Sequence, residues 1–315
     1  MGDTAPDEFR FLTDEASEFQ ISGPLPEARR DRVPDRSGRT VSFIEWGHGG
    51  PVATFLHGAG LNAHTWDATI MALGLPAIAV DLPGHGQSSW RDDADYRAVT
   101  NADAVGSVLE RLGADCQVLV GQSLGGLSAG VVAATNPGAV CGLVVVDVTP
   151  GLDPEIGAEQ VRSFLAGPRD FASRDEIVDR ARAFGIGVSR QAVARGVALN
   201  TRVRDDGRVV FSHHLANLDG LAAVSDDPGS LWPSFERLTI PVLLIRASRG
   251  ILDDRLVAEF LERVPGSESV TIDAGHNVQE DAPVALAATI SSFVSRTAGE
   301  PDAWASSSKG THEHA

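Results

Sequence analysis

The sequence predicts an α/β protein in which helices cover both faces of a mostly parallel sheet. Short continuous apolar runs alternate with segments whose apolar residues recur at helical spacing. Strands that are buried on both faces have continuous apolar runs of this kind, which are typical of parallel sheets. Several runs also end at glycine-rich turns, which separate one strand from the helix that follows it.

The individual elements follow from these patterns. We expect strands at Thr40–Trp46, which alternates, and at the apolar runs Val52–Leu56, Ala77–Val80, Val118–Val120, Leu143–Val146, Val242–Ile245 and Val270–Ile272. We expect helices at Val99–Leu112, which places its valines and leucines on one face, at the small-residue segment Leu124–Thr135, and at Ala282–Phe293.

The stretch between residues 151 and 235 breaks this rhythm, and we call it the cap. It is richer in Arg and Asp, with helical patterns at Asp175–Phe184 and Arg190–Leu199 and a hairpin or loop at Arg204–Phe211. We therefore predict a core formed by residues 38–150 and 236–296, interrupted by this insertion. Residues 1–37 have no sustained period, so we expect a partly disordered extension, and we expect a disordered tail at 297–315.

The charge balance excludes several function classes. The 315 residues carry 26 Lys and Arg against 43 Asp and Glu, which gives a net charge of −17. Nucleic acids and anionic membrane surfaces attract clustered positive charge, so we expect neither as a partner. A small-molecule substrate is left as the expected partner, with the protein a monomer or a homodimer.

The apolar runs and the cysteines bear on the compartment. No run approaches the roughly 18–20 apolar residues that span a bilayer, and the first residues lack the apolar region of a secretory signal. We expect a cytoplasmic protein in which Cys116 and Cys141 are buried reduced thiols rather than a disulfide. The near absence of lysine beside many arginines indicates a bacterial genome rich in GC. No Cys/His cluster has zinc spacing, so we expect neither a metal nor another cofactor.

The strongest chemical signal is the sequence Gly-Gln-Ser-Leu-Gly around Ser123. A strand directly before this pattern and a helix directly after it form the tight turn that exposes a serine hydroxyl as a nucleophile. An ordinary serine at a helix N-terminus is the alternative interpretation. The loop His57–Gly60 after another strand adds a second backbone donor, so we expect the N–H groups of Ala59 and Leu124 to form an oxyanion hole.

Two further loops complete the pattern. His276 lies between the last strand and a helix, where it can reach a serine on a neighbouring strand and act as general base and then as general acid. Asp81 and the glycines of residues 81–88 are expected to shape a loop beneath the site. His85 lies in that glycine-rich turn and precedes the serine, so it is not the expected catalytic histidine.

Together, HGAG, DLPGHGQS, GQSLGG and GHNVQED resemble the α/β-hydrolase superfamily in their order and rough spacing, over residues 38–296. The resemblance implies an α/β-hydrolase fold, with a mostly parallel eight-stranded sheet and a helical cap inserted after the strand that ends at Asp147. It also implies a triad in the order serine, acid, histidine, in which Ser123 and His276 take the first and last places.

The acid departs from the pattern that is common in this family. Most members carry it after the strand corresponding to Val242–Ile245, but that position falls near Gly250 here, and the next carboxylates are Asp253 and Asp254. Some members carry it after the strand that follows the nucleophile helix, where this chain has Asp147. We favour Asp147 because the end of an apolar strand suits a buried carboxylate that orients an imidazole. Asp253, Asp254 or no functional acid are the alternatives.

The motifs thus predict a serine hydrolase that cleaves a small to medium uncharged ester or lactone. The alternatives are a C–C bond hydrolase of a ring-cleavage product, or a relative that does not hydrolyse, such as a lyase, a cyclisation catalyst or a ligand receptor. In the cap, several polar residues either line the pocket or face solvent, namely Asn200, Arg202, Arg204, His213 and His214. Several apolar residues either form the ceiling of the site or pack the cap onto the core, namely Phe164, Leu165, Phe171, Phe184 and Phe211.

Overall fold

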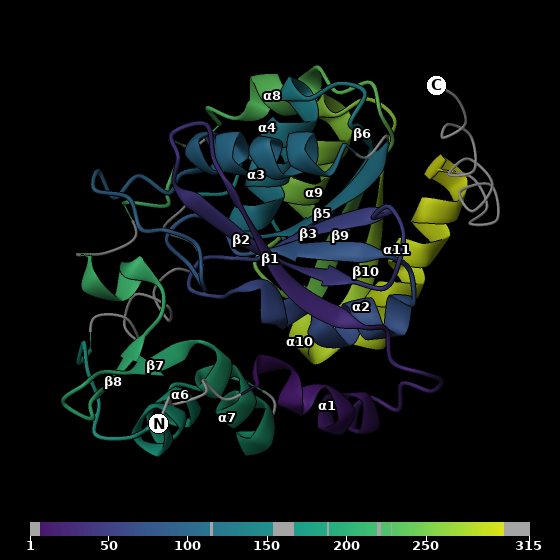
Figure 1. The fold of residues 1–315 in the computed structure, drawn as a ribbon. Coiled ribbons are helices and arrows are strands. Elements are labelled where there is room, and N and C mark those ends of the chain that lie inside the picture. Colours follow the sequence, from purple (N-terminus) through teal and green to yellow (C-terminus); the bar gives the residue numbers. More distant parts are fainter. Residues whose placement is uncertain are drawn as a thin grey trace, which may run out of the picture.

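We analysed a computed structural model of the chain, which describes residues 7–113, 116–153, 167–187, 189–218, 222–227 and 229–298. Eight strands form one sheet in the order β1-β2-β4-β3-β5-β6-β9-β10. Strand β2 is antiparallel to both of its neighbours, and the strands from β4 to β10 are all parallel to one another. The predicted mostly parallel eight-stranded sheet is therefore confirmed (Figure 1).

The strands of this sheet have the following bounds: β1 Ala28–Pro34, β2 Thr40–Trp46, β3 Ala53–Leu56, β4 Ala77–Val80, β5 Gln117–Gln122, β6 Val140–Val146, β9 Val242–Arg249 and β10 Ser267–Gly275. The main helices of the core are α2 Asp67–Leu73, α3 Ala98–Leu112, α4 Leu124–Thr135, α8 Trp232–Glu236, α9 Asp254–Arg263, α10 Val278–Asp281 and α11 Pro283–Ala298. Helix α8 lies almost wholly in the segment that we predicted as cap, but Trp232 and Phe235 pack in the core, so the boundary predicted at 235/236 falls inside a core helix. The strands and helices predicted for the core all occur, although most extend a few residues beyond the predicted bounds.

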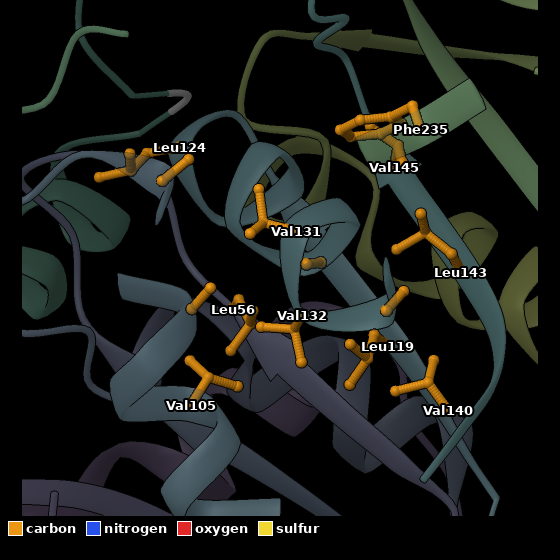
Figure 2. Packing of buried hydrophobic residues seen from close by; sticks show 14 of the residues in the cluster. Leu56, Val105, Leu119, Leu124, Val131, Val132, Val140, Leu143, Val145 and Phe235 are labelled. Carbon is orange, nitrogen blue, oxygen red and sulfur yellow. The ribbon is translucent and has the colours of Figure 1, made fainter. Parts of the chain in front are cut away.

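Each face of the sheet has its own apolar core. One core joins the sheet to α3, α4, α8 and α9, and Figure 2 shows part of it, with Leu56, Leu119, Val132 and Phe235 among the labelled side chains. The other joins the sheet to α2 and α11 on the opposite face. Because helices cover both faces, the central strands are buried throughout, and this explains why their sequences are continuous apolar runs.

The cap has a third, separate apolar core. It contains α6 Arg174–Ala183, α7 Arg190–Leu199 and the hairpin of β7 Thr201–Val203 and β8 Val209–Phe211. The predicted helices and hairpin are present, and Phe171 and Phe211 belong to this core. Figure 1 shows these elements to one side of the main sheet. The predictions for Phe164, Leu165 and the tail beyond residue 298 lie outside the described residues.

The N-terminal segment is more ordered than we expected. Residues 8–34 form a short helix η1 (Glu8–Phe11), the helix α1 (Leu12–Glu18) and the edge strand β1. Strand β1 has the sequence ARRDRVP, in which charged residues hide the apolar alternation of a strand. Ion pairs add to the packing of its buried Val33: Arg30 bonds to the buried carboxylate of Asp81 at 2.7 Å and to Glu8 at 2.8 Å.

The prediction of reduced cysteines is wrong in this structure. Cys116 and Cys141 form a disulfide with their Cα atoms 4.9 Å apart. Cys116 directly precedes β5 and Cys141 lies at the beginning of the adjacent strand β6, so the parallel pairing of the two strands brings the thiols together. The bond lies at the amino ends of these strands.

Candidate active site

Ser123 occupies a sharp turn between β5 and α4. Its backbone has φ 53° and ψ −122°, a conformation that a residue with a side chain rarely adopts. The flanking glycines make the turn feasible. A Cβ on Gly121 would lie 2.3 Å from the carbonyl oxygen of Gly125, and a Cβ on Gly125 would lie 2.2 Å from that of Leu56. The strained turn places Ser123 at the N-terminus of α4, where the first N–H groups have no partner within the helix.

His276 lies after β10 and bonds to Asp147, which lies after β6. Its Nδ1 is 2.8 Å from Oδ2 of Asp147. Because β5, β6 and β10 are parallel, their carboxyl ends meet at one edge of the sheet together with Ser123. The amide of Gln122, the residue before the serine, donates to the carbonyl oxygen of His276 at 3.3 Å and thereby joins the histidine loop to the turn.

Asp147 is fully buried and is held by backbone donors. Its Oδ1 accepts from the N–H of Ala247 at 3.0 Å, and its Oδ2 accepts from that of Ile251, also at 3.0 Å. Its carboxylate fills the space above Gly250, where an added Cβ would lie 2.1 Å from Oδ2. A side chain at position 250 and the carboxylate of Asp147 therefore compete for the same volume.

The two alternative acids are engaged elsewhere. The side chain of Asp253 caps α9 by accepting from the N–H of Leu256 at 2.8 Å. Asp254 is exposed and pairs with Arg246. Of the three candidate carboxylates, the structure thus brings only Asp147 to His276.

The loop predicted to hold the oxyanion is fixed by histidines. Nδ1 of His57 bonds to the carbonyl oxygen of Gly58 at 2.8 Å, while its Nε2 accepts from the N–H of Leu82 at 3.0 Å. The bond from Leu82 makes Nε2 the acceptor, so Nδ1 carries the proton. Because the N–H of a trans peptide points away from its carbonyl, this bond also sets the direction of the Ala59 N–H.

The next residue of the loop, Gly60, is held at both ends. Its N–H donates to Nε2 of His85 at 3.1 Å, and its carbonyl oxygen accepts from Nδ2 of Asn200 at 2.6 Å. Burial lowers the pKa of both His57 and His85, so the two imidazoles are neutral near pH 7 and can accept these bonds. Asp81 supports the neighbouring loop as expected, by accepting from the N–H groups of Ala63 and Gln87.

The remaining polar residues of the cap are divided between interior and surface. His213 is buried and stacks on His85 with a ring-centroid distance of 6.1 Å, and Nδ1 of His214 forms a hydrogen bond of 2.7 Å with the hydroxyl of Tyr96. Arg202 is exposed, and Arg204 pairs with nearby aspartates on the surface. Phe184 lies under the guanidinium of Arg180.

Sequence reasoning missed three residues that position the site. Gln122 and His57 stand inside motifs that we recognised, but the motif pattern does not say what their side chains bind. Asn200 was one of several polar residues of the cap, and no local signal separates it from those that face solvent. Within the described residues, no group of three or more His, Cys, Asp or Glu side chains is placed to hold a metal ion.

Comparison with known proteins identifies the family. A model described as the alpha/beta hydrolase family matches residues 55–289. The chain belongs to this family. This membership confirms the predicted fold and the predicted enzyme class. None of the helices that the structure describes is long and apolar enough to cross a membrane.

Individual relatives of this alpha/beta hydrolase are bacterial and mammalian enzymes. It is 38% identical to esterase Rv0045c of Mycobacterium tuberculosis over 291 residues, which are 90% of this chain and 94% of the relative. It is 28% identical to lipase LipV of the same organism, over 78% of this chain and 95% of that one. A solved structure of esterase Rv0045c covers 92% of this chain and 99% of its own with a TM-score of 0.80.

Proposed function

We propose that the protein is a serine hydrolase that cleaves a small to medium uncharged carboxylic ester or lactone through an acyl-enzyme. The observation that carries the proposal is the bond of 2.8 Å between His276 and the buried Asp147, at the sheet edge where the strained turn presents Ser123. The similarity to an esterase over nearly the whole chain supports the same chemistry.

In the proposed mechanism, Oγ of Ser123 attacks the carbonyl carbon while Nε2 of His276 takes the hydroxyl proton. Asp147 accepts from Nδ1 and stabilises the imidazolium that forms. The N–H groups of Ala59 and Leu124 hold the negative oxygen of the tetrahedral intermediate. His276 then gives its proton to the leaving alcohol, and a water activated by the same imidazole hydrolyses the acyl-enzyme and regenerates Ser123.

Several finer expectations belong to this proposal. A net charge of −17 disfavours anionic substrates, although the local field of a pocket can outweigh it. Assembly as a monomer or homodimer and a cytoplasmic location stay predictions. The disulfide between Cys116 and Cys141 argues against the cytoplasmic location, because such bonds persist mainly in oxidising compartments.

The proposal is tested by incubating the protein with a fluorophosphonate probe and measuring its intact mass, beside turnover of p-nitrophenyl esters of increasing chain length. We expect one adduct per chain and ester turnover, both lost in Ser123→Ala. Ser107→Ala is the matched control, because the hydroxyl of this helix serine donates to the carbonyl oxygen of Asp103 in α3 at 3.0 Å, away from the site, and both signals should survive there.

Other outcomes favour the alternatives. An adduct without ester turnover would favour C–C bond hydrolysis, which a vinylogous diketone substrate would then reveal. A folded wild-type protein that forms no adduct would contradict the proposal. A lyase, a cyclisation catalyst or a ligand receptor would then be favoured.

A further inference from the structure

A side chain of the cap, that of Asn200, forms a hydrogen bond to the loop that carries the proposed oxyanion donor. Asn200 directly follows α7, and its Nδ2 donates to the carbonyl oxygen of Gly60 at 2.6 Å. Gly60 directly follows Ala59, whose N–H is the donor expected in the hole. The contact therefore links a residue of the inserted cap to the backbone that must be in place when negative charge develops.

The orientation of the Asn200 amide is fixed by a chain of hydrogen bonds. The N–H of His64 donates to Oδ1 of Asn62 at 2.9 Å, so the nitrogen of that amide points the other way. This Nδ2 of Asn62 donates to Oδ1 of Asn200 at 3.3 Å and to the carbonyl oxygen of Leu199 at 3.1 Å. With its oxygen facing Asn62, the amide of Asn200 presents its nitrogen to Gly60.

The backbone of Asn200 is held as firmly as its side chain. Its N–H donates to the carbonyl oxygen of Gly196 in α7 at 2.9 Å, and its own carbonyl accepts from the N–H of Ser212 after β8 at 2.9 Å. Asn200 thus stands at the junction of the helix and the hairpin of the cap. A movement of either element relative to the core would move this amide.

Gly60 needs such a partner. With His85 holding its N–H and Asn200 holding its carbonyl oxygen, both polar groups of the residue are bonded to side chains. Gly60 has φ +77°, a value that glycine adopts easily and that residues with a side chain rarely adopt. Because glycine also adopts many other backbone conformations, hydrogen bonds are needed to hold Gly60 in this one. Loss of the Asn200 bond would leave the Gly60–Leu61 peptide held by the bond from the N–H of Leu61 to the carbonyl oxygen of Gly58 at 3.2 Å. That carbonyl belongs to the same peptide as the Ala59 N–H, so a shift of Gly60 reaches the expected oxyanion donor through this bond.

We propose that Asn200 is a positioning residue that couples docking of the cap to the geometry of the oxyanion hole. The inference rests on the proposed function, since it assigns Asn200 to the hole of that reaction. The cap then contributes to the rate of the chemical step as well as to the choice of substrate.

The test compares Asn200→Asp with Ser189→Ala in the full chain. Aspartate has nearly the shape of asparagine but cannot donate to Gly60 when ionised, and its charge repels the carbonyl. Ser189 caps the same helix at its other end by accepting from the N–H of Ala192 at 3.0 Å, so its loss loosens α7 without touching Gly60. Thermal melting shows that each variant is folded, and Asn200→Ala replaces Asn200→Asp if the charge prevents folding.

We expect Asn200→Asp to lower kcat about tenfold to a hundredfold, since removal of a whole oxyanion donor costs about a hundredfold to a thousandfold. KM should change by less than about threefold, because substrate binding before the reaction does not use the hole fully. The affinity for a trifluoromethyl ketone, whose adduct with serine carries the oxyanion, should fall by the same factor as kcat/KM. Deuterium exchange of the peptide containing residues 57–62 should also increase, and Ser189→Ala should show none of these changes.

Three results would overturn the inference. The first is a kcat of Asn200→Asp within twofold of wild type, and the second is an equal loss in Ser189→Ala, which would indicate general loosening of the cap. The third is unchanged exchange in residues 57–62. A wild-type protein that the fluorophosphonate leaves unmodified would instead overturn the proposed function, and the role in its oxyanion hole with it.

Discussion

Asp147 occupies a position that only its surroundings explain. It follows a buried apolar strand, adopts φ 50°, and places its carboxylate between two backbone N–H groups and His276. A carboxylate at Gly250 would need the same space, because even a Cβ there would lie 2.1 Å from Oδ2 of Asp147. Glycine at position 250 therefore leaves the space that the carboxylate of Asp147 occupies, so an acid at position 147 requires a residue without a side chain at position 250.

We predict that Asp147→Asn lowers kcat about a thousandfold or more, because a neutral amide no longer stabilises the imidazolium and favours the wrong tautomer of His276. Asp253→Asn and Asp254→Asn are the controls: asparagine also caps a helix well, and Asp254 is exposed. Steady-state turnover of a p-nitrophenyl ester measures all three variants. A large loss in either control with an active Asp147→Asn would reverse the assignment.

At the scale of elements, the sequence correctly predicted the strands and helices that have a clear apolar pattern. Strands β2 and β4 and helices α4 and α7 have the predicted bounds, since each is a continuous or periodic run between clear turns. Strand β1 was missed because charged residues dominate it, and helix α1 because its seven residues offer too few apolar positions for a helical period. Helix α1 is instead joined to the cap by Arg195 of α7, which bonds to Glu18 at 2.8 Å and lies 3.3 Å from Glu15.

The disulfide belongs to the unit β5–α4–β6, which presents Ser123 at its other end. It closes a loop with a sequence separation of 25 residues, and the chain-entropy model gives such a bond about 3 kcal/mol of stability. We predict that Cys116→Ser/Cys141→Ser lowers the melting temperature by several degrees and leaves kcat within about twofold. Thermal melting and ester turnover measure the two effects, and wild-type protein in reductant is the matched control.

Two outcomes would contradict this prediction. An unchanged melting temperature would mean that the thiols are not joined in solution. A large loss of kcat in a variant that remains folded would mean that the amino ends of β5 and β6 affect the site at their carboxyl ends.

At the scale of the whole molecule, buried histidines set the pH range of stability. Burial lowers the pKa of His57, His85 and His213, the last to about 3, so the folded protein keeps them neutral where the unfolded chain binds protons. Burial also opposes the charge on His64, but the carboxylates of Asp67 and Glu8 outweigh it and raise its pKa to about 9. The three histidines with a lowered pKa make stability depend on pH below the usual histidine pKa of 6.5, and His64, with its raised pKa, makes it depend on pH above that value.

We predict that the free energy of unfolding is greatest near pH 6.5. Below this pH the unfolded chain takes up protons at three histidines that the folded protein leaves neutral, so stability falls as the pH falls. Between pH 6.5 and about 9 only the folded protein keeps the proton on His64, and up to about pH 8 only the folded protein keeps the proton on Glu15, whose pKa burial raises. Stability therefore falls as the pH rises, by up to about 1.4 kcal/mol per pH unit for each group. Urea denaturation at pH 5, 6.5 and 8.5 measures both slopes.

The variant His64→Gln provides the control for the alkaline side. It should be less stable than wild type at pH 6.5 and show a flatter decline toward pH 9, because the proton that the folded state retains is gone. A wild-type stability that still increases between pH 6.5 and 8.5 would contradict the role assigned to His64.

The sequence by itself determined the succession of core strands and helices along the chain, and it determined which loops carry Ser123 and His276. These features are local: an apolar run defines a strand, and a glycine-flanked serine between a strand and a helix defines a turn. Only the tertiary structure decided which carboxylate meets His276, that Asn200 holds Gly60, and that Cys116 meets Cys141. Each of these is a contact between residues far apart in the chain, and its distance is set by sheet pairing and by docking of the cap, which no local pattern records.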